Sequence, residues 1–144
     1  MAHELYLASE EATEKLGAYL SELTPPGGTW LLCGELGVGK TTWTRGFVAG
    51  LGGEPRQVSS PTFSVLHRYE APNGLIYHLD LFRIGPSGIW ELGLEDTITE
   101  MDWLVVEWAG GEGPWASDWV STLELLPVSV GRKAIWCGSA ITEP

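Results

Sequence analysis

The residues with the clearest chemical signature form a glycine-rich segment in the first third of the chain. Residues 34–41 read Gly-Glu-Leu-Gly-Val-Gly-Lys-Thr and match the pattern G-x-x-x-x-G-K-[S/T] at every fixed position. Glycine reaches backbone conformations that are costly for other residues, so successive N–H groups in such a loop can turn inward around an anion. The pattern predicts a phosphate-binding loop in which Lys40 reaches the β- and γ-phosphates, Thr41 ligates Mg²⁺ and Thr42 offers a further hydroxyl.

The segments on either side of this loop fit the same chemistry. Residues 29–33 form a short apolar run with several β-formers, which predicts a buried strand. From Lys40 a helix is predicted to run to about Leu51, where Gly52 and Gly53 end it. Because a helix N-terminus carries partial positive charge, a strand, a glycine loop and a helix in this order predict a site for the phosphates of a nucleotide.

Two acidic residues are candidates to hold the metal ion opposite the loop. Glu107 ends the apolar run of residues 104–107, where P-loop proteins place their second acidic element, with Glu in place of the commoner Asp. Asp80 lies within an apolar strand, where an unpaired carboxylate is costly. The pattern leaves three roles open for Asp80: the metal ion, a salt bridge with Arg68 or Arg83, or the solvent face of an edge strand.

A hydroxyl-rich segment, Ser-Ser-Pro-Thr at residues 59–62, follows the predicted helix. Its hydroxyls could sense the γ-phosphate or Mg²⁺, as the switch loop of a GTPase does, and a plain polar loop fits the pattern equally. The chain's only lysines are Lys15, Lys40 and Lys133, and none lies in the Asn-Lys-x-Asp sequence that reads guanine. Adenine is therefore the expected base.

The rest of the chain alternates between strand and helix signals. Further strands are predicted at residues 3–7, 63–69, 75–82, 103–108, 119–126 and 133–137, and further helices at 9–23, 86–92 and 95–99. This layout predicts a single α/β domain over residues 1–144, built as a three-layer sandwich of the P-loop NTPase type. The central sheet is expected to be mixed, mostly parallel, with antiparallel edge strands, and ligands are expected at the carboxyl ends of its strands.

Composition and charge exclude several classes of protein. The chain has 144 residues, 44% of them hydrophobic, which suffices for one domain with a sizeable core. Its formal net charge of −11 repels nucleic acid, so unaided binding of tRNA or DNA is not expected. The sequence shows neither an apolar run of the roughly 20 residues that cross a bilayer nor a signal peptide, which predicts a cytoplasmic protein without membrane contact. Cys33 and Cys137 lie in predicted strands among apolar residues, which predicts buried free thiols.

Five short motifs occur in a fixed order: Gly-Glu-Leu-Gly-Val-Gly-Lys-Thr-Thr (34–42), Ser-Pro-Thr-Phe (60–63), His-Leu-Asp-Leu-Phe-Arg (78–83), Glu-Leu-Gly-Leu (91–94) and Val-Glu-Trp (106–108). Together they resemble the TsaE family, also called YjeE, over roughly Thr13 to Arg132. The resemblance implies an ATPase required to make threonylcarbamoyladenosine (t6A) in tRNA, beside the anticodon. It also implies TsaB and TsaD as partners that carry out the transfer, with ATP hydrolysis resetting their complex and tRNA reached only through it.

The resemblance also implies roles for single residues. Lys40, Asp80 and Glu107 would be catalytic, with Asp80 or Glu107 positioning the attacking water, and Thr41, Glu107 and Asp80 would hold Mg²⁺. Trp108 matches a family tryptophan important for activity, although a buried packing role would explain it as well. One departure is Phe82, where many members carry Tyr. The implied nucleotide contacts are Gly37, Val38, Gly39, Lys40, Thr41, Thr42, Thr62 in a switch-like loop, and Thr13 and Arg132, which read as surface residues without the resemblance.

Three functions fit a phosphate-binding loop. An ATP-driven switch is expected to hydrolyse slowly alone and faster in its complex, because the chain is poor in arginine and an arginine finger is often supplied by a partner. A small-molecule kinase would need an arginine-rich lid, which the sequence does not show. A nucleotide-sensing module would bind ATP without turning it over. His67 and His78, in the predicted hairpin, are expected to be strand-face histidines with satisfied hydrogen bonds, and neither receives a role.

Overall fold

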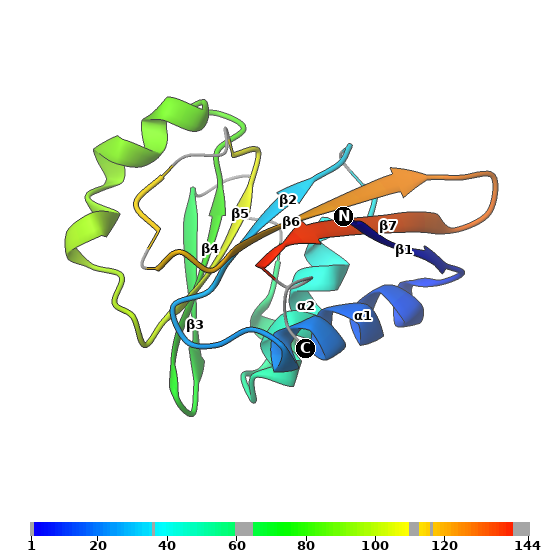
Figure 1. Cartoon of the computed structure of the whole chain (residues 1–144), viewed down its shortest axis with the longest axis horizontal. Coiled ribbons are helices and arrows are strands. Elements are labelled where there is room, and N and C mark those ends of the chain that lie inside the picture. Colours follow the sequence, from blue (N-terminus) through cyan, green and yellow to red (C-terminus); the bar gives the residue numbers. More distant parts are fainter. Residues whose placement is uncertain (1, 36, 60–64, 110–112, 116, 140–144) are drawn as a thin grey trace.

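The computed structural model is built around a seven-stranded sheet with the order β1-β7-β6-β2-β5-β4-β3 (Figure 1). The structure describes residues 2–35, 37–59, 65–109, 113–115 and 117–139. The strands are β1 (Ala2–Leu7), β2 (Thr29–Cys33), β3 (Leu66–Ala71), β4 (Gly74–Asp80), β5 (Trp103–Glu107), β6 (Val120–Pro127) and β7 (Arg132–Gly138). The helices are α1 (Glu10–Glu22) and α2 (Lys40–Gly50), with the 3-10 helices η1 (Pro55–Gln57), η3 (Pro86–Leu92) and η4 (Leu94–Asp96).

The strand directions give the sheet a parallel centre and antiparallel edges. β6, β2, β5 and β4 run parallel to one another, whereas β7 and β1 at one edge and β3 at the other pair antiparallel. The predicted mixed α/β sheet is therefore confirmed. The prediction that a strand continues to Phe82 is wrong, because the Asp80 carboxylate accepts the N–H of Phe82 at 2.9 Å and the chain turns where β4 ends.

Helices cover the two faces of the sheet unequally (Figure 1). α1 and α2 lie together on one face and pack their apolar side chains, such as Leu20 and Phe47, against Trp30 and Val105 of the sheet. The opposite faces of β2, β4 and β5 are covered by the η3–η4 segment, whose Ile89 and Leu94 belong to a second apolar cluster. The sandwich thus has one α-helical layer, the sheet, and one layer of short 3-10 helices.

The two α-helices approach each other closely through glycine. A Cβ at Gly17 would lie 2.1 Å from the carbonyl oxygen of Trp43, and a Cβ at Gly46 would lie 1.9 Å from that of Glu14. Any larger residue at either position would push the helices apart. Ser9 caps α1 as the sequence predicts, since its hydroxyl accepts the N–H of Ala12 at 3.1 Å. This hydrogen bond fixes the residue at which α1 begins.

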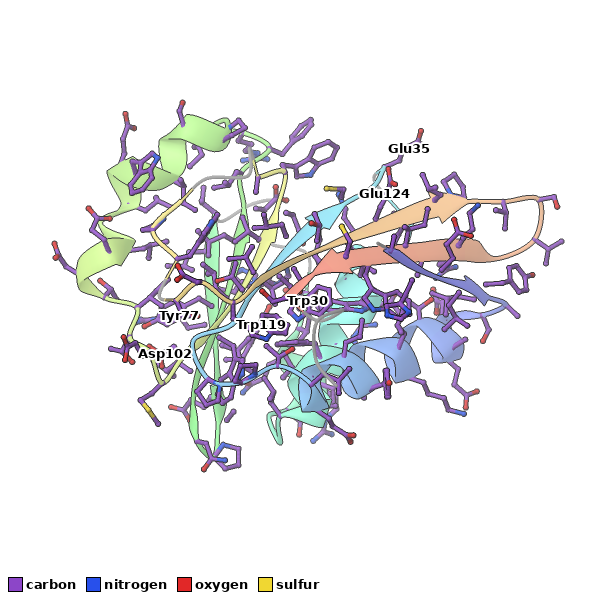
Figure 2. All side chains as sticks on the ribbon, viewed as in Figure 1. Trp30, Glu35, Tyr77, Asp102, Trp119 and Glu124 are labelled. Carbon is purple, nitrogen blue, oxygen red and sulfur yellow. The ribbon has the colours of Figure 1, made fainter. Side chains whose placement is uncertain are left out.

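Asp102, labelled in Figure 2, fixes the lateral position of β4 beside β5. One carboxylate oxygen accepts the backbone N–H of Leu75 at 3.1 Å, and the other accepts that of Thr99 at 2.9 Å. β4 and β5 then run in parallel register from Ile76↔Trp103 to Asp80↔Glu107. The register at the start of the two strands therefore decides which acidic side chains meet at their ends.

The cysteines depart from the sequence prediction. Cys33 and Cys137 are free thiols as expected, but Cys33 is exposed and Cys137 is half-buried. Cys33 is the last residue of β2 and pairs in register with Glu124 of β6, near the end of the sheet where Figure 2 labels Glu124 and Glu35. Leu31, on the same face of β2, belongs to the apolar cluster beneath η3 and η4, whereas Cys33 lies beyond it. No described helix is both long enough and apolar enough to cross a bilayer.

Candidate functional site

The loop between β2 and α2 has the conformation that the glycine pattern predicts. Gly34, Gly37 and Gly39 all have positive φ, at 149°, 80° and 118°. A Cβ at Gly34 would lie 2.8 Å from the carbonyl oxygen of Leu125, so the loop can pass this point only with glycine. Gly39 is the N-cap of α2 and provides no side-chain cap, which leaves the first N–H groups of α2 available to an anion.

A cavity of about 250 Å³ lies over this loop, at the carboxyl ends of β4 and β5. This is where the sequence predicts the ligand. Eight of the predicted site residues line it, six of them predicted nucleotide contacts and two the predicted carboxylates, together with one residue that was not predicted. The lining residues are Glu10, Gly37, Gly39, Lys40, Thr41, Thr42, Asp80, Glu107 and Arg132.

Lys40 is buried at the floor of this cavity, with 5% of its surface exposed. Its Nζ donates to the carbonyl oxygen of Gly34 at 2.8 Å and lies 3.7 Å from Oε1 of Glu107. It also lies 4.1 Å from the centre of the Trp108 ring, a cation–π contact. The ammonium is thus held by a carbonyl, a carboxylate and an aromatic face, and all three lie beside the predicted phosphate site.

Asp80 and Glu107 end neighbouring parallel strands and are register partners. Both are buried, with 5% and 4% of their surfaces exposed. The interpretation of Asp80 as a solvent-facing residue of an edge strand is wrong, because β4 lies between β5 and β3. Arg68 pairs in register with Tyr77, which lies three residues before Asp80 in β4. Because side chains alternate between the two faces of a sheet, Arg68 lies on the face opposite to Asp80.

The oxygen donors of the cavity fit Mg²⁺. Mg²⁺ prefers oxygen ligands and is usually held by one or two carboxylates together with water and substrate phosphates. Asp80 and Glu107 supply carboxylates and Thr41 supplies a hydroxyl in one cavity. Within the described ranges no cluster of three or more His, Cys, Asp or Glu side chains could hold a metal by itself. The two carboxylates and the hydroxyl therefore fit an ion that also takes water and phosphate ligands.

Trp108 follows Glu107 with an unusual backbone conformation. Its φ of 65° is the only positive value among the described residues other than glycine. The ring contacts Lys40 on one side and lies 5.0 Å from the ring of Phe82. Its indole Nε1 is buried and finds no hydrogen-bond partner in the described part of the chain. Residues held in such a conformation concentrate at functional sites, because the surrounding structure must compensate for their strain.

Arg132 and Thr13, two predicted nucleotide contacts, meet beside the loop. Arg132 lines the cavity, and its Nη1 donates to the hydroxyl of Thr13 at 3.2 Å. Thr13 is fully buried and does not line the cavity, and neither does Val38. Thr62 and the rest of residues 60–63 lie outside the described residues, so the switch-loop prediction stays a prediction.

Comparison with known proteins identifies the chain's relatives. The family model described as "Threonylcarbamoyl adenosine biosynthesis protein TsaE" matches residues 7–130. The chain belongs to the TsaE family. This confirms the resemblance inferred from the five motifs. The matched range contains all the predicted site residues except Arg132, which lies two residues beyond its end.

Individual TsaE proteins resemble the chain over most of its length. The tRNA threonylcarbamoyladenosine biosynthesis protein TsaE of Rickettsia conorii is 40% identical over 104 residues, which cover 72% of this chain and 59% of that protein. The Bacillus subtilis protein of the same name is 36% identical over 99 residues, covering 69% and 61%. The Synechocystis protein is 34% identical over 129 residues, covering 86% and 74%. The chain therefore aligns with about three fifths of the Rickettsia conorii and Bacillus subtilis proteins.

A solved structure shares the TsaE fold seen here. The crystal structure of Bacillus subtilis YdiB superposes with a TM-score of 0.71 at 23% identity, covering 94% of this chain and 84% of that one. At this identity the likeness concerns the fold alone, the mixed sheet with its covering helices.

Sequence reasoning missed two residues of this TsaE site. Glu10, the first residue of α1, lines the cavity, and nothing in its local sequence indicates this. His78 is fully buried, and its Nε2 lies 2.7 Å from Oε2 of Glu107. The expectation that His78 has a satisfied hydrogen bond is confirmed, but its partner is a site carboxylate. Its position two residues before Asp80 in a strand could have indicated that both face the same side.

Proposed function

We propose that this TsaE-family chain is a Mg²⁺-dependent ATPase required for t6A modification of tRNA next to the anticodon. It acts in the cytoplasm with TsaB and TsaD, and its binding and hydrolysis of ATP reset their complex. The observation that supports this most directly is the meeting of the glycine loop, Lys40 and two buried carboxylates around one cavity. Membership of the TsaE family supports the tRNA pathway.

The phosphates of ATP would bind at the start of α2. The N–H groups of residues 37–42 and the helix N-terminus favour an anion there. Lys40 would leave the carbonyl oxygen of Gly34 and reach the β- and γ-phosphates, which replace Glu107 as its counter-charge. Arg132, at the wall of the cavity, adds a second positive charge beside the loop.

Asp80 and Glu107 would divide the work at the γ-phosphate. Mg²⁺, when bound, would neutralise negative charge that develops on the phosphates. The Thr41 hydroxyl and one or both carboxylates would hold it. A carboxylate that does not ligate the metal ion can orient the attacking water by accepting its proton. Both carboxylates end their strands at the same level, so each lies close enough to share this task.

Charge distribution supports a partner-dependent enzyme. Arg132 is the only arginine among the described lining residues of the cavity. An additional arginine from a partner would stabilise the charge of the transition state and raise turnover by orders of magnitude. With a net charge of −11, the chain would contact tRNA only indirectly, through TsaB and TsaD.

Phosphate release from Mg²⁺–ATP tests this function, measured with the purified chain alone and with TsaB and TsaD. We expect slow release alone, faster release in the complex, and loss of about 100-fold or more in Glu107→Gln and Lys40→Ala. Lys15→Ala, at an exposed position of α1, is the matched control and should keep wild-type turnover. Saturable ATP binding without phosphate release would instead indicate a nucleotide-sensing module, and phosphate transfer to a nucleoside or sugar would indicate a kinase. Absence of saturable ATP binding would contradict all three.

A further inference from the structure

A line of hydrogen bonds leads from the cavity into the sheet through His78. Nε2 of His78 lies 2.7 Å from Oε2 of Glu107, and its Nδ1 lies 3.1 Å from the hydroxyl of Tyr69. The Tyr69 hydroxyl in turn lies 3.4 Å from Nδ1 of His67. His78 and Tyr69 have 0% and 3% of their surfaces exposed. The line therefore runs through the interior, between a site carboxylate and strand β3.

We propose that His78 is a positioning residue that fixes the Glu107 carboxylate for the metal ion and the attacking water. The inference rests on the proposed ATPase function, since it assigns a task within that reaction. His78 lines no part of the cavity and acts only through Glu107. Nothing in the sequence motif of the loop requires this contact, which depends on β4 and β5 being neighbours.

The two oxygens of Glu107 have different partners, and this difference orients the carboxylate. Oε2 is bound to His78 at 2.7 Å, whereas Oε1 lies 3.7 Å from Nζ of Lys40. The terminal torsion of a glutamate is soft, so the carboxylate would rotate freely without a fixed partner. The short contact with His78 holds Oε2 inside the sheet and leaves Oε1 directed at the cavity. When Lys40 moves to the phosphates, Oε1 becomes the free oxygen, while the His78 contact remains.

Tyr69 is placed to stabilise the tautomer of His78 that this task needs, because its hydroxyl lies 3.1 Å from Nδ1. A neutral imidazole has one donor nitrogen and one acceptor nitrogen. With the Tyr69 hydroxyl donating to Nδ1, the proton resides on Nε2, where it can be donated to Glu107. Hydrogen-bonded partners of metal-binding groups orient them in this way, and their loss typically lowers metal affinity or activity about 10- to 100-fold. The hydrogen bonds of Tyr69 reach Glu107 through His78, so Tyr69 acts one step further away.

Two substitutions at the same position separate positioning from packing. The amide nitrogen of Gln occupies nearly the place of imidazole Nε2, whereas that of Asn occupies nearly the place of Nδ1. His78→Gln can therefore still donate a hydrogen bond to Glu107, whereas His78→Asn can hydrogen-bond only to Tyr69. We expect His78→Asn to lower kcat about 10- to 100-fold, with the KM for ATP changed little, and His78→Gln to recover most of the loss. His3→Asn and His3→Gln, on the edge strand β1, are the matched controls.

Metal binding gives a readout that does not depend on turnover. Titration calorimetry measures the affinity for ADP with and without Mg²⁺. We expect His78→Asn to bind ADP alone as the wild type does, and to lose about 10-fold or more of the gain in affinity that Mg²⁺ provides. If His78→Asn does not fold, as judged by thermal unfolding, Tyr69→Phe replaces it and should lower kcat more than either His3 variant.

Three results would overturn the positioning role alone. Equal losses in the Asn and Gln variants would show that His78 serves packing only. Wild-type kcat and Mg²⁺ dependence in His78→Asn, or no change in Tyr69→Phe beyond the controls, would show that Glu107 needs no positioning. In these cases the ATPase function itself stands. If the wild-type protein binds ATP but never hydrolyses it, the ATPase function and the positioning role fail together.

Discussion

The Lys40 ammonium and the Glu107 carboxylate face each other at 3.7 Å with their side chains only 4% and 5% exposed. At this depth each charge depends on the other, because removing water from a single buried charge is expensive. In the proposed reaction a triphosphate and its metal ion would separate the pair, and the site already holds one positive and one negative group for them.

Removal of the Lys40–Glu107 pair should cost less stability than the two single removals added together. Lys40→Met leaves the Glu107 carboxylate buried without its ammonium, and we expect a loss of about 3 to 5 kcal/mol in the free energy of unfolding. Lys40→Met combined with Glu107→Gln should lose less than the sum of the single losses, by about 1 kcal/mol or more. Urea unfolding of the four proteins measures this coupling.

The exposed pair of Glu11 and Lys15 on α1 is the control for this cycle. Its atoms lie 3.2 Å apart, closer than those of the buried pair, but the side chains are 77% and 76% exposed. Solvent screening should limit the coupling of Glu11→Gln and Lys15→Met to about 0.5 kcal/mol. Equal coupling in the two cycles would show that burial does not govern the Lys40–Glu107 pair.

The backbone of Trp108 should carry measurable strain. At φ 65°, a residue with a Cβ is disfavoured and glycine is not. Trp108→Gly and Trp108→Ala both remove the indole and its contacts with Lys40 and Phe82. We therefore expect the Gly variant to be the more stable by about 1 kcal/mol, although glycine usually destabilises. Denaturant unfolding compares the two, and a more stable Ala variant would contradict the strained conformation.

The parts of the site that follow from local sequence could be predicted, and the others could not. The glycine loop, Lys40 and Thr41 are set by one contiguous pattern and the helix that follows it. Glu107 could be inferred because an apolar strand ends at it. These predictions need no knowledge of which strands are neighbours, since each depends on a single element and its end.

The contacts that were missed depend on register across the sheet. His78 meets Glu107 over 29 residues because β4 and β5 pair in parallel, a register that Asp102 helps to fix at the other end. Arg132 meets Thr13 over 119 residues because β7 pairs with β1, next to α1. The burial of Cys33 was predicted wrongly for a related reason, since the extent of the η3–η4 layer cannot be inferred from the strand's own sequence.

The Tyr69 hydroxyl should make stability fall at high pH. Burial raises the pKa of Tyr69 to about 12 from its ordinary value of 10.0, with the nearby Glu107 adding to the rise. In the unfolded chain the hydroxyl ionises at about pH 10, so the folded state holds the proton more tightly and its stability is complete below that pH. Stability is then lost as the pH rises from about 10 to about 12.

Denaturant unfolding across this pH range measures the loss, with Tyr69→Phe as the comparison. The variant should show a flatter decline of unfolding free energy above about pH 10, whatever its stability at neutral pH. The difference in tyrosinate absorbance between the two folded proteins should titrate with a midpoint near 12. A midpoint near 10 would show that the hydroxyl is open to water.

Thr13 should affect nucleotide binding only through Arg132. The Thr13 hydroxyl is fully buried, donates to the carbonyl oxygen of Ser9 at 3.1 Å and accepts Nη1 of Arg132 at 3.2 Å, while Arg132 alone of the two lines the cavity. Arg132→Ala removes a positive charge from the wall of the cavity and should weaken ATP binding about 10-fold, the value of one charge-assisted hydrogen bond. Thr13→Val, which keeps the shape of the side chain, should weaken binding less, by loosening the guanidinium.

The double variant decides between this indirect role and a direct nucleotide contact. If Thr13 acts by holding Arg132, Thr13→Val in the Arg132→Ala background should leave ATP affinity unchanged, because the group it positions is gone. A direct contact would instead give the same loss in both backgrounds. Affinities from titration calorimetry on the four proteins make the comparison, and the additive result would require Thr13 to leave its buried position when ATP binds.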